Sequence, residues 1–190
     1  MDFKQYQSYF ETIKNTPLEQ QNAPYDNPDY LNYTKLNWSR MNRWLKTGEI
    51  TEELRNALQQ IYEPQQWIVI TEPWCGDAAH ITPFLELAGR ENPLVSVSYE
   101  LRDSAPHRIE NYRTNGTLSI PKLIIKDEHD EDLNVWGPRP LECVKLFERL
   151  KAENAEADKI KEEIQQWYNS NKGLEIQKEL AALIREAVSA

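Results

Sequence analysis

Cys75 is the residue of this sequence with the clearest chemical potential. It stands in the stretch Trp74-Cys75-Gly76-Asp77-Ala78, between a predicted strand and a predicted helix. A cysteine at a helix start meets free backbone N–H groups and the positive end of the helix dipole, which stabilise a thiolate by about 0.3–1 kcal/mol. The carboxylate of Asp77 opposes this by about 1 kcal/mol. The two effects nearly cancel, so we predict an ordinary or mildly acidified thiol unless a cation lies close.

His80 and Cys143 are the other side chains that could take part in chemistry at this turn. Five residues at about 100° each turn His80 away from Cys75 around the helix, so His80 is disfavoured as a general base. No His/Cys cluster has zinc-like spacing, and we predict no metal site. Cys143 could resolve an oxidised Cys75, but its place on an apolar helix face favours a buried structural thiol.

The segments around Cys75 have the hydrophobic patterns of alternating strands and helices. Trp67 to Thr71 is a continuous apolar run, and Leu94 to Leu101 alternates apolar and polar residues. A helix from Asp77 to Arg90 would join them as parallel neighbours. The remaining predicted elements are a helix from Ser104 to Asn115, a strand from Lys122 to Ile125, a turn from Asp127 to Asp130, a strand ending at Trp136 and a helix after Pro140.

Four features of this order resemble the thioredoxin family. They are the Trp-Cys-Gly turn at Cys75, a proline at Pro83 that would kink the following helix, the Ile120-Pro121 pair that opens a strand, and Gly137 after the last strand. The resemblance covers roughly residues 67–151. It implies an α/β, thioredoxin-like fold with a mixed sheet in the order β-α-β-α-β-β-α, and a cis-proline at Pro121.

The sequence departs from this family at the positions that carry its redox chemistry. The second cysteine of the Cys-x-x-Cys motif falls on Ala78, which leaves a degenerate Cys-Gly-Asp-Ala motif and no disulfide within it. The buried acid that thioredoxins carry six residues before the first cysteine falls on Val69, which takes up no proton. Standard dithiol oxidoreduction is therefore excluded, and only single-cysteine chemistry remains.

The resemblance also implies a binding groove beside Cys75. Backbone groups next to the cis-proline would pair with an extended peptide, or with the backbone of a small thiol, as an added strand. Arg139 would border Cys75 and lower its pKa or bind a carboxylate; alternatively it reaches solvent or pairs with Asp77. The tryptophans could instead only cap the edge of the sheet. The expected groove residues are Trp74, Gly76, Asp77, Ile120, Pro121, Trp136, Gly137, Pro138 and Arg139.

Helical segments flank the predicted thioredoxin-like domain, which we place at residues 65–151. The N-terminal extension, residues 1–64, contains apolar stripes at helical spacing that are typical of core packing, with a Pro/Asn-rich connector between them. The C-terminal extension, residues 152–190, is dense in Glu and Lys, which predicts a solvated face. Self-association as a homodimer is the alternative role of its apolar stripes.

Composition limits the classes of partner. The chain has 31 acidic and 22 basic residues, a formal net charge of −9, which argues against nucleic acid and anionic membranes as partners. Two cysteines and a start without a basic, apolar leader predict a reduced, cytoplasmic setting. No apolar run approaches the roughly 20 residues of a membrane-spanning helix.

These observations support two hypotheses of function. In the first, Cys75 exchanges thiols through a mixed disulfide with a protein or a low-molecular-weight thiol, which would act as co-substrate in place of a resident cofactor. In the second, the chain is a non-catalytic peptide- or protein-binding module that has lost dithiol activity. A peroxide-reactive thiol that passes through sulfenic acid is a third option, disfavoured because no resolving cysteine lies nearby in sequence.

Overall fold

The centre of the molecule is a four-stranded mixed sheet with the strand order β2-β1-β3-β4. Strands β1 (Gln65–Thr71) and β2 (Val95–Leu101) are parallel, and α4 (Gly76–Gly89) connects them, as predicted. Strand β3 (Lys122–Lys126) runs antiparallel to both β1 and β4 (Asp132–Trp136). The predicted mixed sheet is therefore confirmed.

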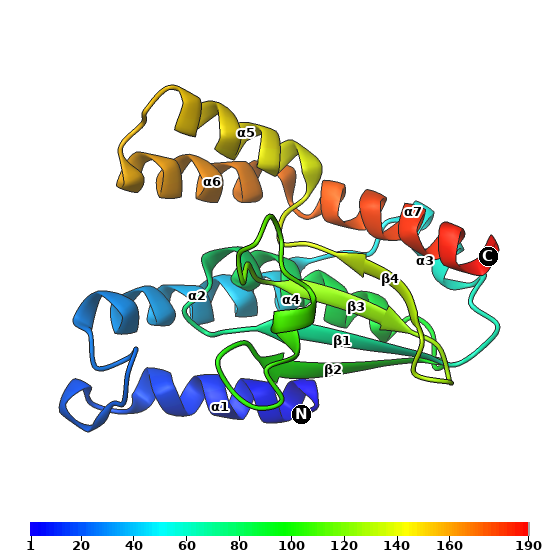
Figure 1. Cartoon of the computed structure of the whole chain (residues 1–190), viewed down its shortest axis with the longest axis horizontal. Coiled ribbons are helices and arrows are strands. Elements are labelled where there is room, and N and C mark those ends of the chain that lie inside the picture. Colours follow the sequence, from blue (N-terminus) through cyan, green and yellow to red (C-terminus); the bar gives the residue numbers. More distant parts are fainter. Residues whose placement is uncertain (190) are drawn as a thin grey trace.

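The computed structural model describes residues 1–189, and Figure 1 shows their arrangement. Helix α1 lies along the β2 side of the sheet, whereas the last helix lies along the β4 side, and two helices form a hairpin beyond one end of the strands (Figure 1). The other helices are α1 (Phe3–Asn15), α2 (Pro28–Thr47), α3 (Glu52–Leu58), α5 (Leu141–Ala152), α6 (Ala157–Asn171) and α7 (Leu174–Ser189).

Side chains at the helix starts explain where several helices begin. Asp2 accepts a hydrogen bond from the backbone N–H of Gln5, whose side chain accepts from the backbone N–H of Asp2, a capping box that starts α1. Thr51 accepts from the N–H of Leu54 and starts α3. Helix α3 ends at Leu58.

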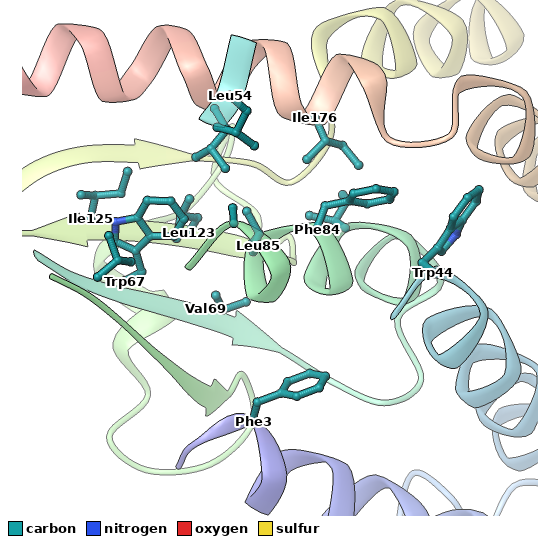
Figure 2. Close-up of a cluster of buried hydrophobic side chains, with 14 of the residues drawn as sticks. Phe3, Trp44, Leu54, Trp67, Val69, Phe84, Leu85, Leu123, Ile125 and Ile176 are labelled. Atoms are coloured by element: carbon teal, nitrogen blue, oxygen red, sulfur yellow. The ribbon is translucent and has the colours of Figure 1, made fainter. Parts of the chain in front are cut away.

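The main hydrophobic core lies on one face of the sheet. Trp67 and Val69 of β1 and Leu123 and Ile125 of β3 point into it and are buried. Figure 2 shows these side chains beside helix α4 and together with residues from both ends of the chain. Residues from α4 and from the N-terminal and C-terminal helices complete the same cluster, among them Phe3, Trp44, Leu54, Phe84, Leu85 and Ile176. The helical extensions and the sheet therefore share one core.

The opposite face of the sheet is covered by a loop, and here one sequence prediction is wrong. Residues Ser104 to Asn115 do not form the expected α-helix; only a short 3₁₀ helix, Arg108–Asn111, interrupts the loop. Pro106 provides no backbone N–H for a helix, and His107 adopts a left-handed conformation with φ of 55°. Ile109 is the one buried residue of this 3₁₀ helix, and it packs against Ile68, Ile70 and Ile124 of the sheet.

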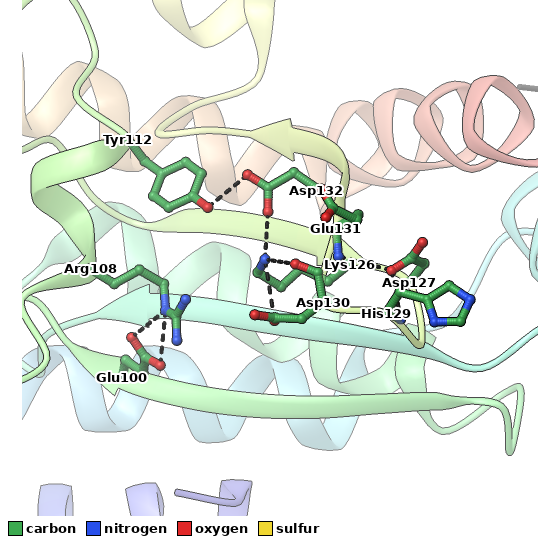
Figure 3. Close-up of polar contacts among 9 residues, drawn as sticks. All are labelled: Glu100, Arg108, Tyr112, Lys126, Asp127, His129, Asp130, Glu131 and Asp132. Carbon is green, nitrogen blue, oxygen red and sulfur yellow. Dashed lines mark hydrogen bonds and ion pairs between the residues drawn. The ribbon is translucent and has the colours of Figure 1, made fainter.

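Polar contacts fix this loop to the edges of the sheet, as Figure 3 shows. Arg108 donates to both carboxylate oxygens of Glu100 in β2, at 3.1 and 3.0 Å. Tyr112 donates to Asp132 at 2.7 Å, and Asp132 pairs with Lys126 at 2.9 Å. The loop therefore reaches from β2 across to β4. No helix among residues 1–189 has the length and apolar character needed to cross a membrane.

Candidate functional site

Cys75 lies where the structure joins β1 to α4, at the N-cap of that helix. Its sulfur accepts a hydrogen bond from the backbone N–H of Ala78 at 3.4 Å and donates one to the carbonyl oxygen of Ile120, also at 3.4 Å. The Ile120–Pro121 peptide bond is cis. Cys75 is only 6% exposed and packs with Ile68, Ile70 and Ile120 on the loop-covered face of the sheet.

The environment of Cys75 disfavours a thiolate. Burial, followed by the negative charge of Asp77, raises the pKa of the Cys75 thiol to about 12. The N–H of Ala78 and the charge of Arg139 act in the opposite direction but do not compensate. The prediction from the sequence compared the helix dipole with the charge of Asp77 and did not include the desolvation of a buried sulfur. The expectation of an ordinary or mildly acidified thiol is therefore wrong. At neutral pH the sulfur is protonated.

The cation that was expected beside Cys75 is engaged with a carboxylate. Arg139 forms a bidentate pair with Asp77, with Nε–Oδ1 at 2.9 Å and Nη2–Oδ2 at 2.7 Å. Its guanidinium also lies 4.5 Å from the centre of the Phe147 ring. Tyr168 from α6 donates to Asp77 Oδ1 at 2.8 Å. Of the two sequence interpretations of Arg139, the pairing with Asp77 is therefore the one that the structure contains.

His80 supports the fold on the inner side of this network. Trp44 donates to His80 Nδ1 at 2.8 Å, so His80 Nε2 carries the proton and donates to Gln165 Oε1 at 2.7 Å. The ring stacks on Tyr168, with centroids 4.6 Å apart. Burial lowers the pKa of His80 to about 4, which keeps the imidazole neutral. With both ring nitrogens occupied, His80 is not available as a base for Cys75.

Cys143 is fully buried, so the prediction of a buried thiol is confirmed. Burial, followed by the charge of Asp77, raises its pKa to about 12. Both cysteines are free thiols. Among residues 1–189, no three or more His, Cys, Asp or Glu side chains are grouped in a way that could hold a metal ion.

A pocket of about 380 Å³ adjoins Cys75 and contains most of the predicted groove residues. Pro121 and Gly137 were also expected in the groove but are not among the residues that line this pocket. Gly137 has a φ of 109°, and a Cβ atom there would come within 2.4 Å of the Pro121 carbonyl oxygen. This close approach requires glycine. The predicted residues that line the pocket are Trp74, Cys75, Gly76, Asp77, Ile120, Pro138 and Arg139.

Trp136 is a correction to the predicted groove. Its indole N–H donates to Glu179 of α7 at 2.7 Å, and its ring packs against the main core. The register explains this, because Trp136 pairs with Leu123, which points into that core. Side chains of a strand alternate between faces, and the resemblance to a family does not assign the face of this tryptophan. Trp136 therefore lies outside the pocket.

Four residues of the pocket were not predicted: Arg102, Thr117, Leu118 and Ser119. The guanidinium of Arg102 lies 4.5 Å from the centre of the Trp74 ring. A sequence signal for Arg102 existed, because it directly follows β2, and the carboxyl ends of the parallel strands β1 and β2 meet at one edge of the sheet. No comparable signal pointed to residues 117–119.

The segment Leu118 to Ile120 presents free backbone groups to this pocket. Within residues 1–189, the N–H and C=O of Leu118 and of Ser119 and the N–H of Ile120 make no hydrogen bond. Ser119 and Leu118 are half-buried, and Ile120 is buried. Unpaired backbone groups at the edge of a cavity are the arrangement to which an extended chain can add as a strand.

The chain is similar to a protein family and to solved structures. The family model described as thioredoxin matches residues 24–154. The crystal structure of a protein of unknown function from Pseudomonas aeruginosa is 18% identical, with a TM-score of 0.56 and 88% of each chain covered. An HIV epitope-scaffold is 16% identical, with a TM-score of 0.55, and the match covers 97% of this chain and 98% of the scaffold. At such identities the likeness shows the fold alone. The comparison with curated proteins finds no match.

Proposed function

The chain belongs to the thioredoxin family and has a thioredoxin-like fold, and we propose that it is a binding member of that family, one that holds an extended peptide segment of a partner protein beside Cys75 without exchanging a disulfide. The observation that carries this proposal is the state of the Cys75 sulfur. It is buried, hydrogen-bonded to Ala78 and Ile120, and its pKa is raised to about 12. Nucleophilic exchange needs a thiolate, which this environment disfavours.

The surroundings of Cys75 supply what a bound peptide needs. The free backbone groups of Leu118 and Ser119 would form the hydrogen bonds of an added strand. The half-buried ring of Trp74 and the guanidinium stacked on it would contact side chains of the bound segment. In this role Cys75 holds the segment before Pro121 in place through its hydrogen bond to the carbonyl of Ile120.

A single-cysteine thiol transferase is the second candidate, and one observation favours it: Cys75 lines the pocket. In this mechanism the Cys75 thiolate would attack a mixed disulfide, form a new disulfide with one sulfur and release the other as a thiol. A low-molecular-weight thiol would then release the bound group and restore Cys75. Both candidates fit a reduced compartment such as the cytoplasm, where both cysteines stay thiols.

The pH dependence of Cys75 alkylation separates the two candidates. We expect the rate with iodoacetamide, followed by peptide mass spectrometry, to lie well below that of free N-acetylcysteine and to rise about tenfold per pH unit up to pH 9.5, because a thiol with a pKa of about 12 ionises only above that range. A rate that levels off below about pH 8.5 would contradict the binding proposal and support thiol transfer.

A binding experiment tests the proposed function directly. Peptides are selected from a displayed random 12-residue library on the wild-type protein, and the affinity of a selected peptide is then measured for variants. Trp74→Ala should weaken it roughly 30-fold, in line with about 2 kcal/mol for a central aromatic contact. Cys75→Ser should change it less than about threefold. Tyr62→Ala, which removes an aromatic ring that is 78% exposed elsewhere, serves as the matched control.

Two results would overturn the proposal. One is a selected peptide whose binding is lost in Cys75→Ser, because the sulfur would then be the group that the ligand needs. The other is the absence of any peptide that distinguishes wild type from Trp74→Ala. Equal weakening by Tyr62→Ala would assign the selected peptides to a different surface.

A further inference from the structure

A second pocket, of about 300 Å³, lies on the other side of the Asp77–Arg139 pair from the groove. Its walls come from four helices: α2, the start of α4, and the hairpin of α5 and α6, which Figure 1 shows beyond the end of the strands. Because residues of both helical extensions build it, the thioredoxin-like core alone does not contain this pocket. Its volume is at the lower end of those of small-molecule sites.

The inner surface of the pocket is apolar. Phe147 of α5 and Ile160 and Ile164 of α6 line it, and the ring of Tyr33 closes it from α2. Ile164 is only 4% exposed, whereas the other three are half-buried. Tyr33 is held close to the backbone of α4, since a Cβ atom on Gly76 would come within 2.6 Å of the Tyr33 hydroxyl. The apolar surface is therefore built on fixed elements.

The rim of the pocket is cationic, although the protein as a whole carries a formal net charge of −9. Arg139, Lys151 and Lys161 line the pocket, and the guanidinium of Arg40 lies 5.1 Å from the centre of the Tyr33 ring. Asp77 neutralises Arg139, and Lys161 pairs with an exposed carboxylate. Within residues 1–189, neither Lys151 nor Arg40 forms an ion pair with an acidic side chain.

The interior of the pocket is apolar, and its rim carries cations that no acidic side chain neutralises. We therefore propose that this pocket binds a small organic carboxylate with an apolar tail. The tail would replace water against Phe147, Ile160 and Ile164, and the carboxylate would lie at the rim within reach of Lys151. Lys151 Nζ lies 5.4 Å from the centre of the Phe147 ring and Arg40 donates to Asn37 Oδ1 at 2.8 Å, so a purely apolar ligand would leave both cations with neutral partners and no anionic one. A phosphate-like ion without a tail would leave the apolar surface uncovered.

This site is separate from the peptide groove, and the inference does not rest on the function proposed for the groove. The two pockets share only Gly76, Asp77 and Arg139. The ligand classes differ as well, since the groove offers free backbone groups of residues 118–120 and this pocket offers side-chain cations over an apolar surface. Binding in one pocket can therefore be measured without the other.

Isothermal titration calorimetry on the full chain with octanoate and with its uncharged analogue octanamide tests the proposal. We expect octanoate to bind at least tenfold more tightly than octanamide. Lys151→Gln should weaken octanoate at least fivefold and leave octanamide unchanged. Ile160→Trp, which fills the pocket, should abolish the binding of both. The matched control is Lys145→Gln, which removes an exposed lysine of the same helix that pairs with Glu142.

Three results would overturn the proposal. They are equal affinities for octanoate and octanamide, no binding of octanoate at millimolar concentration, and equal weakening of octanoate by Lys145→Gln and Lys151→Gln. Lys151 is exposed, so its replacement leaves the fold intact and a loss of binding reports on the pocket itself.

Discussion

Replacing Asp77 by alanine is expected to lower the free energy of unfolding by about 3–5 kcal/mol. The side chain of Asp77 is 12% exposed and joins Arg139 from the segment before α5 to Tyr168 of α6. Its removal would leave the guanidinium of Arg139, itself 23% exposed, without its bidentate partner and the buried Tyr168 hydroxyl without its acceptor. A charge and a hydroxyl that are largely shielded from water and have lost their partners each lower the free energy of unfolding, because water does not replace the lost interactions.

Urea denaturation followed by tryptophan fluorescence measures this effect. The matched control is Asp103→Ala, because Asp103 also forms a bidentate pair with an arginine, Arg102, but is 49% exposed. Exposed pairs contribute about 0–1 kcal/mol, so the control should change little. A loss below about 1.5 kcal/mol in Asp77→Ala, or an equal loss in both variants, would mean that the network around Asp77 does not hold the α5–α6 hairpin to the domain.

The strands of this fold were predictable from the sequence because their patterns are local. Trp67 to Ile70 is apolar throughout, as expected for a strand buried on both faces, and the structure has it within the central strand β1. The alternation in Val95–Leu101 likewise matches an edge strand, β2. Each pattern depends only on the residues of the strand itself, so no knowledge of distant contacts was needed.

The segment from Ser104 to Asn115 shows where such local reasoning fails. Its Ile109 and Tyr112 are three residues apart, which fits a helix, yet only a short 3₁₀ helix forms. The backbone is instead determined by contacts with two strands at opposite edges of the sheet, to Glu100 in β2 and to Asp132 in β4. The sequence does not reveal these partners. Pro106, near the start of the segment, was the one local feature that argued against a helix.

The acidity of Cys75 could not be predicted for a related reason. Helix dipole and charge repulsion can be read from positions 75 to 78, but burial depends on which residues cover the sulfur. Those residues include Ile109 and Ile120, which lie more than thirty positions later in the chain. The pairing of Asp77 with Tyr168, ninety-one positions away, is equally invisible in the sequence. Desolvation is a property of the packed structure and decides the chemistry here.

Glu72 is a buried acid that was not predicted from the sequence. The expected position for such a group was Val69, and its replacement by an apolar residue suggested that no buried proton site remained. Glu72 is only 4% exposed, three residues before Cys75, and accepts a hydrogen bond from the backbone N–H of Asp103 at 3.0 Å. The charge of Asp103 acts to raise the pKa of Glu72, and the charge of Arg102 acts to lower it. A buried carboxyl therefore does lie near the site, at a different position in the chain.

The ionisation of Glu72 is expected to make the stability of the protein fall between pH 5 and pH 8. Burial raises the pKa of Glu72 from 4.5 to about 7 in the folded state. Between these two values the folded protein keeps a proton that the unfolded chain has lost, so the free energy of unfolding decreases as pH rises through this window. The pKa difference corresponds to about 3 kcal/mol, which is lost once the pH exceeds the folded-state pKa.

Glu72→Gln isolates this contribution because glutamine keeps the size and the hydrogen-bond acceptor but carries no charge. At pH 5 the variant and the wild type should have similar free energies of unfolding, whereas at pH 8 the variant should be more stable by about 3 kcal/mol. Urea denaturation at pH 5, 6, 7 and 8 gives this difference, with Glu11→Gln on the exposed side of α1 as the control. A difference between Glu72→Gln and wild type that does not change with pH would show that Glu72 is ionised throughout, and that the cost of burying its charge is met by its neighbours.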